Sequence, residues 1–156
     1  MPIMTETDVR PDDGVTWAEP SDAAAGIALA VLLPNDADPG ELVPHFARIA
    51  LIGIPFPSFA DGRGFSLAKR LRDLGYRGRL RARGHVIADQ FRYALACGFD
   101  EVQIDDALAA RQPASLWHRA ADISPAPFQR RSRTAQAAAE AQRAAADAAL
   151  CFGHHY

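Results

Sequence analysis

The sequence predicts an α/β domain with a mainly parallel sheet of about four strands and additional C-terminal helices. Short apolar runs of strand length alternate along the chain with amphipathic helical patterns. This alternation is typical of right-handed βαβ crossovers. Closure of the sheet into a partial barrel is an alternative arrangement of the same elements.

The first part of the domain is expected to form a strand, a helix and a second strand. An unbroken apolar run over residues 27–33 predicts a strand buried on both faces. Asp38 is suited to cap a short helix that starts at Pro39 and ends near residue 47. A second apolar run over residues 48–54 predicts the next strand, which Pro55 is expected to stop.

The rest of the domain is expected to repeat this pattern. Ser66 can cap an amphipathic helix, and Gly75 and Gly98 are suited to end helices. The expected elements are a helix over 66–74, a strand over 78–82, a helix over 86–96, a strand over 101–104, and helices over 105–111 and 115–122.

Both ends of the chain are expected to lie outside the domain. Residues 1–25 are acidic and contain prolines, so we expect a flexible segment there and a single α/β domain over 26–123. Residues 124–156 hold a Pro-marked linker and an Ala-rich segment, which favours a helix but buries little area. No signal peptide pattern or bilayer-length apolar run is found, so we expect a cytoplasmic protein with no membrane partner.

No pattern indicates a metal, a cofactor or a catalytic group. Cys97 and Cys151 form neither a metal knuckle nor a disulfide framework. His85 could act as an acid or base near neutral pH, but it has no identifiable partner in the sequence. We therefore expect no metal site, no cofactor and no independent catalytic activity.

Basic residues cluster in one stretch of the chain. Residues 61–92 contain nine Lys and Arg against three Asp, so this stretch carries +6 while the remainder carries −8. All but one of the basic residues are arginines, whose planar fork suits carboxylate, phosphate and similar oxyanions. The overall net charge of −2 argues against a nucleic-acid partner.

The candidate site lies in two loops that each join an expected strand to an expected helix. Ligands of parallel α/β sheets bind at the carboxyl ends of the strands. The candidate residues for binding a ligand or a partner are Asp61, Gly62, Arg63, Gly64, Ser66, Arg81, Arg83, Asp89 and Gln90.

The Asp-Gly-Arg-Gly segment has two interpretations of equal weight. Backbone N–H groups near Gly62 and Gly64 could bind an anion at a helix N-terminus, with Arg63 supplying positive charge. Alternatively, the glycines only make a tight turn that the Asp61 side chain closes.

Four arginines alternate along the third expected strand and should share one face of it. They are Arg77, Arg79, Arg81 and Arg83. The last two lie nearest the carboxyl end and are the better binding candidates, because the first two are expected to be solvated. Asp89, beside Gln90 in the next helix, is expected to orient Arg63 or Arg83.

These segments resemble a family of uncharacterised bacterial proteins. The family pattern F-x-x-F-x-D-G-R-G-[FY]-S, L-R-A-x-G-x-V-x-x-D-Q and C-G-F-D corresponds to Phe56–Ser66, Leu80–Gln90 and Cys97–Asp100. The similarity covers about residues 28–104. Members are commonly encoded beside the assimilatory sulfite reductase haemoprotein, so the resemblance implies an accessory role in sulfite reduction.

Two functions are therefore expected. The first is an accessory protein that docks on the sulfite reductase haemoprotein or its electron donor through an Arg-rich loop face. The second is an enzyme or sensor that binds a small oxyanion or a phosphorylated ligand with the DGRG and RARG loops. A purely structural interpretation, in which both loops only form turns, is the alternative to both.

Overall fold

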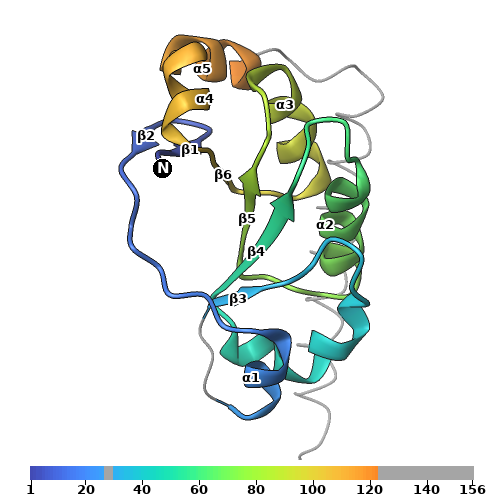
Figure 1. The fold of residues 1–156 in the computed structure, drawn as a ribbon. Coiled ribbons are helices and arrows are strands. Elements are labelled where there is room, and N and C mark those ends of the chain that lie inside the picture. The colour runs from blue at the N-terminus through green and yellow to red at the C-terminus, as the bar shows by residue number, and fades with distance from the viewer. Residues whose placement is uncertain (27–29, 123–156) are drawn as a thin grey trace, which may run out of the picture. The chain divides into compact units, whose positions relative to one another are not determined.

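A six-stranded sheet forms the centre of the domain that the structure describes. The computed structural model describes residues 1–26 and 30–122 (Figure 1). The strands are β1 (Ile3–Thr5), β2 (Val9–Arg10), β3 (Ala30–Leu32), β4 (Leu51–Phe56), β5 (Arg79–Gly84) and β6 (Glu101–Gln103). Their order in the sheet is β2-β1-β6-β5-β4-β3, so β2 and β3 are the edges of an open sheet, not a partial barrel.

The strand directions confirm the predicted mainly parallel α/β class. β3, β4, β5 and β6 run parallel to one another, whereas β1 is antiparallel to both β6 and β2. The helices are α1 (Pro20–Ala24), the 3-10 helix η1 (Pro39–Arg48), α2 (Arg63–Asp73), α3 (Ala88–Cys97), α4 (Asp106–Arg111) and α5 (Ala114–Asp122).

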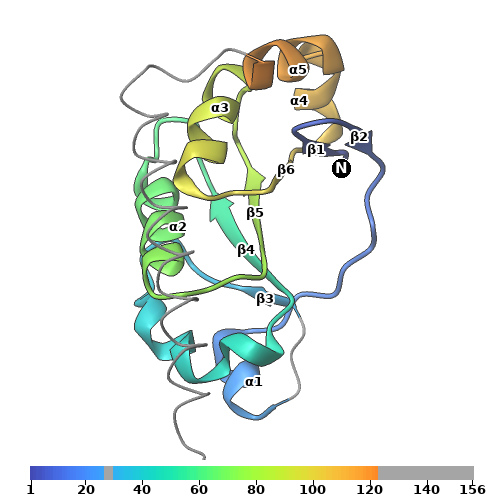
Figure 2. The same ribbon diagram turned by 180° about the vertical axis from the view of Figure 1, so that it is seen from behind.

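The two faces of the sheet are covered by different parts of the chain. α2 and α3 cover one face, while α4 and α5 lie beyond the carboxyl end of β5, where α3 packs against α5 (Figures 1 and 2). The opposite face is crossed by residues 11–19, which we call the N-terminal strap. Trp17 of the strap lies so close to Gly53 that a Cβ there would come within 2.6 Å of the indole ring.

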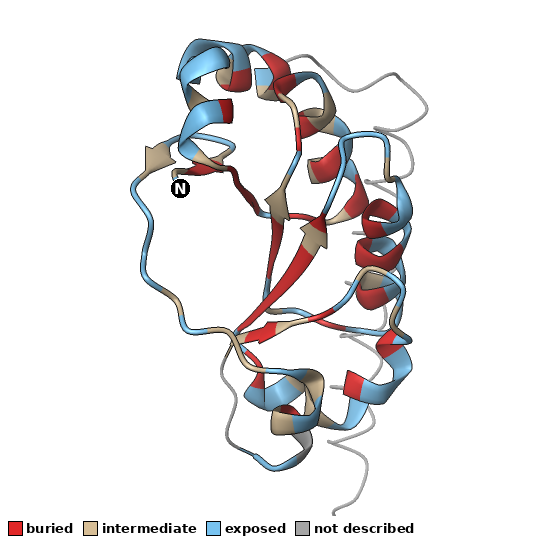
Figure 3. Ribbon diagram, in the orientation of Figure 1, coloured by how far each residue is buried: buried red, intermediate tan, exposed pale blue. Residues whose placement is uncertain are grey.

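The hydrophobic core lies between the sheet and α2 and α3, as the buried inner surfaces in Figure 3 show. Its strand residues follow period two along β4, β5 and β6, whereas the alternate residues face the strap. The core side chains of these strands include Ile52, Ile54, Phe56, Leu80, Ala82 and Val102. Cys97 is also buried, and burial raises the pKa of its thiol.

The N-terminal segment belongs to the domain, which corrects our expectation of a flexible stretch over residues 1–25. β1 hydrogen-bonds to β6 and extends the sheet, with Ile3 opposite Gln103. Ile3 and Met4 are buried. A strand of three residues is too short for a period-two pattern to be recognised in the sequence. In the structure, the burial of its side chains holds it in the sheet. The compact unit spans residues 1–122, and the expected Ala-rich helix lies outside the described residues.

Two element boundaries also differ from expectation. α2 begins at Arg63, so Ser66 lies inside the helix and does not cap it. Pro55 lies within β4 instead of stopping the strand. β3 pairs with β4 only as far as Gly53, so no ladder partner requires an N–H at Pro55. Within the described residues, no helix is long and apolar enough to cross a membrane.

Candidate functional site

The loops that follow β4 and β5 lie side by side at the carboxyl edge of the sheet, as the sequence predicted. The backbone N–H of His85 donates to the carbonyl of Phe56 over 2.9 Å. Gln90 then joins the loops through its side chain. Its amide nitrogen donates to the carbonyl of Phe59 over 2.7 Å, and its amide oxygen accepts from the N–H of Ile87 over 3.2 Å. Gln90 therefore fixes both the loop after β4 and the start of α3.

The Asp61 side chain closes the Asp-Gly-Arg-Gly turn. One carboxylate oxygen accepts from the backbone N–H of Arg63 over 3.1 Å and from its Nε over 3.0 Å. The other accepts from Nη2 of Arg63 over 2.8 Å and from the Asn35 amide over 3.0 Å. The hydrogen bonds from Arg63 hold the pKa of Asp61 well below its ordinary value. These contacts favour the turn interpretation, because Asp61 already accepts from the backbone N–H and the guanidinium of Arg63, which were expected to serve an anion.

The two glycines of this turn have different surroundings. A Cβ at Gly64 would collide with the Phe56 ring, so only glycine allows α2 to approach β4 so closely. A Cβ at Gly62 would meet nothing within 4 Å. Ser66 is exposed on α2. Gly64 is thus required by packing, independently of any ligand.

Arg81 is fully buried on the strap face of the sheet, at 0% exposure. Its Nη1 and Nη2 contact the two carboxylate oxygens of Asp13 at 2.9 and 2.5 Å, and its Nε donates to Glu101 over 2.8 Å. Burial alone disfavours the charge, but the hydrogen bonds from Arg81 to Asp13 and Glu101 outweigh it and raise the pKa of Arg81. Arg81 therefore holds the strap to the sheet and offers no group to a ligand, which corrects its expected role.

Arg83 lies on the same face as Arg81, as the period-two pattern predicted. Its Nε donates to the Gln103 side chain over 3.1 Å, and its guanidinium carbon lies 4.9 Å from the centre of the Trp17 ring. Burial, followed by the charge of Arg81, lowers the pKa of Arg83. Arg83 thus faces the strap, whereas Arg63 starts a helix on the other face, and the two do not converge on one ligand.

Asp89 does not have the expected orienting role. It is exposed in the first turn of α3 and makes no ion pair with Arg63 or Arg83 in the described structure. Arg63 is paired with Asp61 instead, and its guanidinium is still 61% exposed. Of the predicted site residues, Asp61 and Arg63 contact each other. Gln90 contacts the loop after β4, which leads to Asp61.

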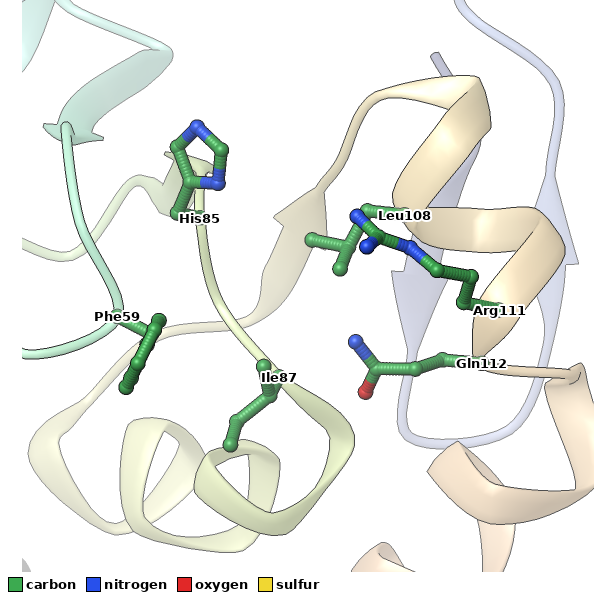
Figure 4. A pocket seen from close by; sticks show the side chains of 6 residues that line it. All are labelled: Phe59, His85, Ile87, Leu108, Arg111 and Gln112. Carbon is green, nitrogen blue, oxygen red and sulfur yellow. The ribbon is translucent and has the colours of Figure 1, made fainter.

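A pocket of about 380 Å³ opens at the carboxyl edge of the sheet, beside the Gln90 bridge (Figure 4). It is lined by Phe59 from the loop after β4, by His85 and Ile87 from the loop after β5, and by Leu108, Arg111 and Gln112 from α4 and its end. Figure 4 shows Phe59 and Ile87 on one side and the α4 residues opposite them. The two loops were predicted from sequence patterns, whereas Arg111 and Gln112 were not, because no pattern at the end of α4 singles them out.

Gln112 holds α4 and α3 together at the floor of this pocket. Its side-chain oxygen accepts from the backbone N–H of Ala88 over 2.6 Å, and its carbonyl accepts from the Trp117 indole over 3.3 Å. The side-chain nitrogen of Gln112 points into the pocket (Figure 4). No group of three or more His, Cys, Asp and Glu side chains is placed to hold a metal ion in the part of the chain that the structure describes.

The structure defines a small α/β domain with a mainly parallel sheet and a pocket at the carboxyl edge of that sheet. The chain belongs to DUF934, a family described as a bacterial protein of unknown function, whose model matches residues 30–145. No curated protein and no solved structure matches the chain. The match extends beyond the span of 28–104 indicated by the motifs and includes part of the Ala-rich segment.

Proposed function

We propose that this protein is an accessory protein of assimilatory sulfite reduction that docks on the sulfite reductase haemoprotein. Two lines support the proposal: the resemblance to proteins encoded beside that haemoprotein, and an exposed aromatic side chain and an exposed arginine that lie four residues apart between the end of β4 and the start of α2. Phe59 is 59% exposed, the largest exposure among the large hydrophobic residues of the described chain. Arg63 is 61% exposed.

The proposed docking surface consists of Phe59, Arg63 and His85, which we call the loop surface. Of the nine basic residues in 61–92, Arg72, Arg81 and Arg83 are largely or partly buried and bond to carbonyl, carboxylate or amide groups inside the domain. Arg63 pairs with Asp61, but its side chain stays accessible to a partner. Aromatic and arginine side chains carry much of the binding energy of protein interfaces.

The exposure of the Phe59 side chain is the main observation that supports the proposal. A hydrogen bond to Gln90 fixes the Phe59 carbonyl, and the backbone N–H groups of Ala60 and Asp61 both bond back to Ser58. The loop thus presents a phenyl ring to solvent from a fixed backbone. A fixed ring loses little conformational freedom when a partner covers it.

Co-purification of the full-length protein with the haemoprotein tests the proposal. We expect a complex at low salt that weakens at high salt, because exposed charges are screened. Phe59→Ala together with Arg63→Ala should weaken it about tenfold or more, which corresponds to about 1.4 kcal/mol. Arg48→Ala is the matched control, because Arg48 lies before β4 at the opposite edge of the sheet. The absence of a complex at low salt, with the haemoprotein and with its electron donor, rejects the proposal.

A further inference from the structure

The pocket at the carboxyl edge of the sheet has one positively charged side and one apolar side. Arg111 of α4 is exposed and makes no hydrogen bond or ion pair with any described residue. The two acids at the start of the same helix are already engaged. Asp105 caps α4 by accepting from the N–H of Leu108 over 2.6 Å, and Asp106 pairs with the amino group of Met1 at 3.0 Å. Arg111 therefore brings an uncompensated positive charge to the pocket.

Three other side chains supply an apolar lining. Phe59 and Ile87 form one side of the pocket and Leu108 contributes to the other (Figure 4). Leu108 is 8% exposed and belongs to the core, so this part of the lining is fixed. A ligand with a flat apolar body would remove these surfaces from water, which stabilises binding in proportion to the area buried.

Side chains that can donate hydrogen bonds also line the pocket. The Gln112 side-chain nitrogen points into the pocket while its oxygen is held by the Ala88 N–H, so the amide presents a donor there. The exposed His85 imidazole also lines the pocket. A guanidinium, an amide N–H₂ and an imidazole match the acceptor oxygens of a carboxylate, sulfonate or phosphate.

We infer that this pocket binds a small organic oxyanion, with the anionic head at Arg111 and Gln112 and an apolar body against Phe59, Ile87 and Leu108. The volume of about 380 Å³ lies near the lower end of the range for small-molecule sites, which suits a body of single-ring size. The inference does not depend on docking to a partner protein. It places anion binding at Arg111, a residue outside the DGRG and RARG loops.

Binding of model anions to the full-length protein tests the inference. Isothermal titration calorimetry with phenyl phosphate, benzenesulfonate and benzoate compares head groups on one ring. Inorganic phosphate has an anionic head group but no apolar ring, and benzamide has an apolar ring but no charge. We expect at least one of the aryl anions to bind more tightly than both inorganic phosphate and benzamide. If none of the three binds, or if inorganic phosphate or benzamide binds as tightly as the best aryl anion, the inference is wrong.

Variants then locate the site. Arg111→Gln should weaken binding of the best aryl anion about tenfold or more, the loss expected for one charged contact. Arg48→Gln removes the same charge at the opposite edge of the sheet and should change nothing. Thermal unfolding of Arg111→Gln confirms that the variant is folded. Unchanged affinity in folded Arg111→Gln overturns the assignment. Because Arg63 is not in this pocket, Arg63→Ala should leave anion binding intact, which separates this test from the docking test.

Discussion

Asp13 and Arg81, which are 68 residues apart in the sequence, form a two-point ion pair that fastens the N-terminal strap to the sheet. Arg81 is completely buried, and its Nε is held by Glu101 on the neighbouring strand. Trp17 of the strap lies over both Arg81 and Arg83. A sheet face that carries arginines is thus closed by acidic and aromatic residues from the start of the chain.

Asp13→Ala should destabilise the protein by about 2–3 kcal/mol, because it removes one partner of a buried charge. Arg81 would keep its hydrogen bond to Glu101 but lose both hydrogen bonds to Asp13 of the strap. Urea unfolding measures the change. Glu6→Ala, an exposed acid outside the strap, should stay within about 0.5 kcal/mol of the wild type. An Asp13→Ala variant as stable as Glu6→Ala would show that the ion pair does not hold the strap.

The same pair should make stability depend on pH. Hydrogen bonds from Arg81 lower the pKa of Asp13 below its ordinary value of 3.8. A carboxylate whose pKa is lower in the folded state stabilises that state fully above the unfolded value, and this contribution is lost as the pH falls through the folded value. The wild type should therefore lose more stability than Asp13→Asn on acidification from about pH 6 to about pH 3. Equal losses in urea unfolding at the two pH values would contradict the predicted linkage.

Sequence patterns predicted the elements whose signals are local. Apolar runs located β4, and the alternation of arginines placed Arg79, Arg81 and Arg83 on one face of β5. The partner of Arg81 could not be predicted in this way. Asp13 lies in a Pro-containing acidic stretch with no periodicity, and only the folded sheet brings it to Arg81.

The candidate site likewise has features that local sequence patterns predict and features that only tertiary packing creates. Adjacent loops at the carboxyl edge follow from βαβ connectivity, and the sequence predicted them. The Gln90 bridge contacts the predicted loop pair from the first turn of α3, although its partners were not foreseen. Arg111 and Gln112 reach the pocket only because α3 packs against α5 and the Gln112 side chain binds the start of α3. Such a contact depends on tertiary packing and leaves no short pattern in the chain.

Gly64→Ala and Gly62→Ala should separate packing from ligand binding in the DGRG turn. Gly64→Ala forces a methyl group into the Phe56 ring and should cost about 1–3 kcal/mol. Gly62→Ala enters open space at a φ of −83° and should change stability by less than about 0.5 kcal/mol. Chemical unfolding of both variants measures the difference. Equal stability of the two would mean that the ring moves aside and that close packing does not explain Gly64.

Gln90→Glu should release the loop after β4 without weakening the start of α3. A carboxylate can still accept from the Ile87 N–H, and a negative charge in the first turn suits the helix dipole. It cannot donate to the Phe59 carbonyl, so that hydrogen bond is lost at a cost of about 1 kcal/mol. Gln90→Ala should lose both contacts.

Hydrogen exchange distinguishes these two outcomes. In Gln90→Glu, the amides of Ala60 and Asp61 should exchange faster, while those of α3 keep their wild-type rates. In Gln90→Ala, both groups should exchange faster. Unchanged rates at Ala60 and Asp61 in Gln90→Glu would show that the loop holds its shape through its own bonds to Ser58. The exposed Phe59 would then be positioned by its own loop, and the Gln90 bridge would serve the helix alone.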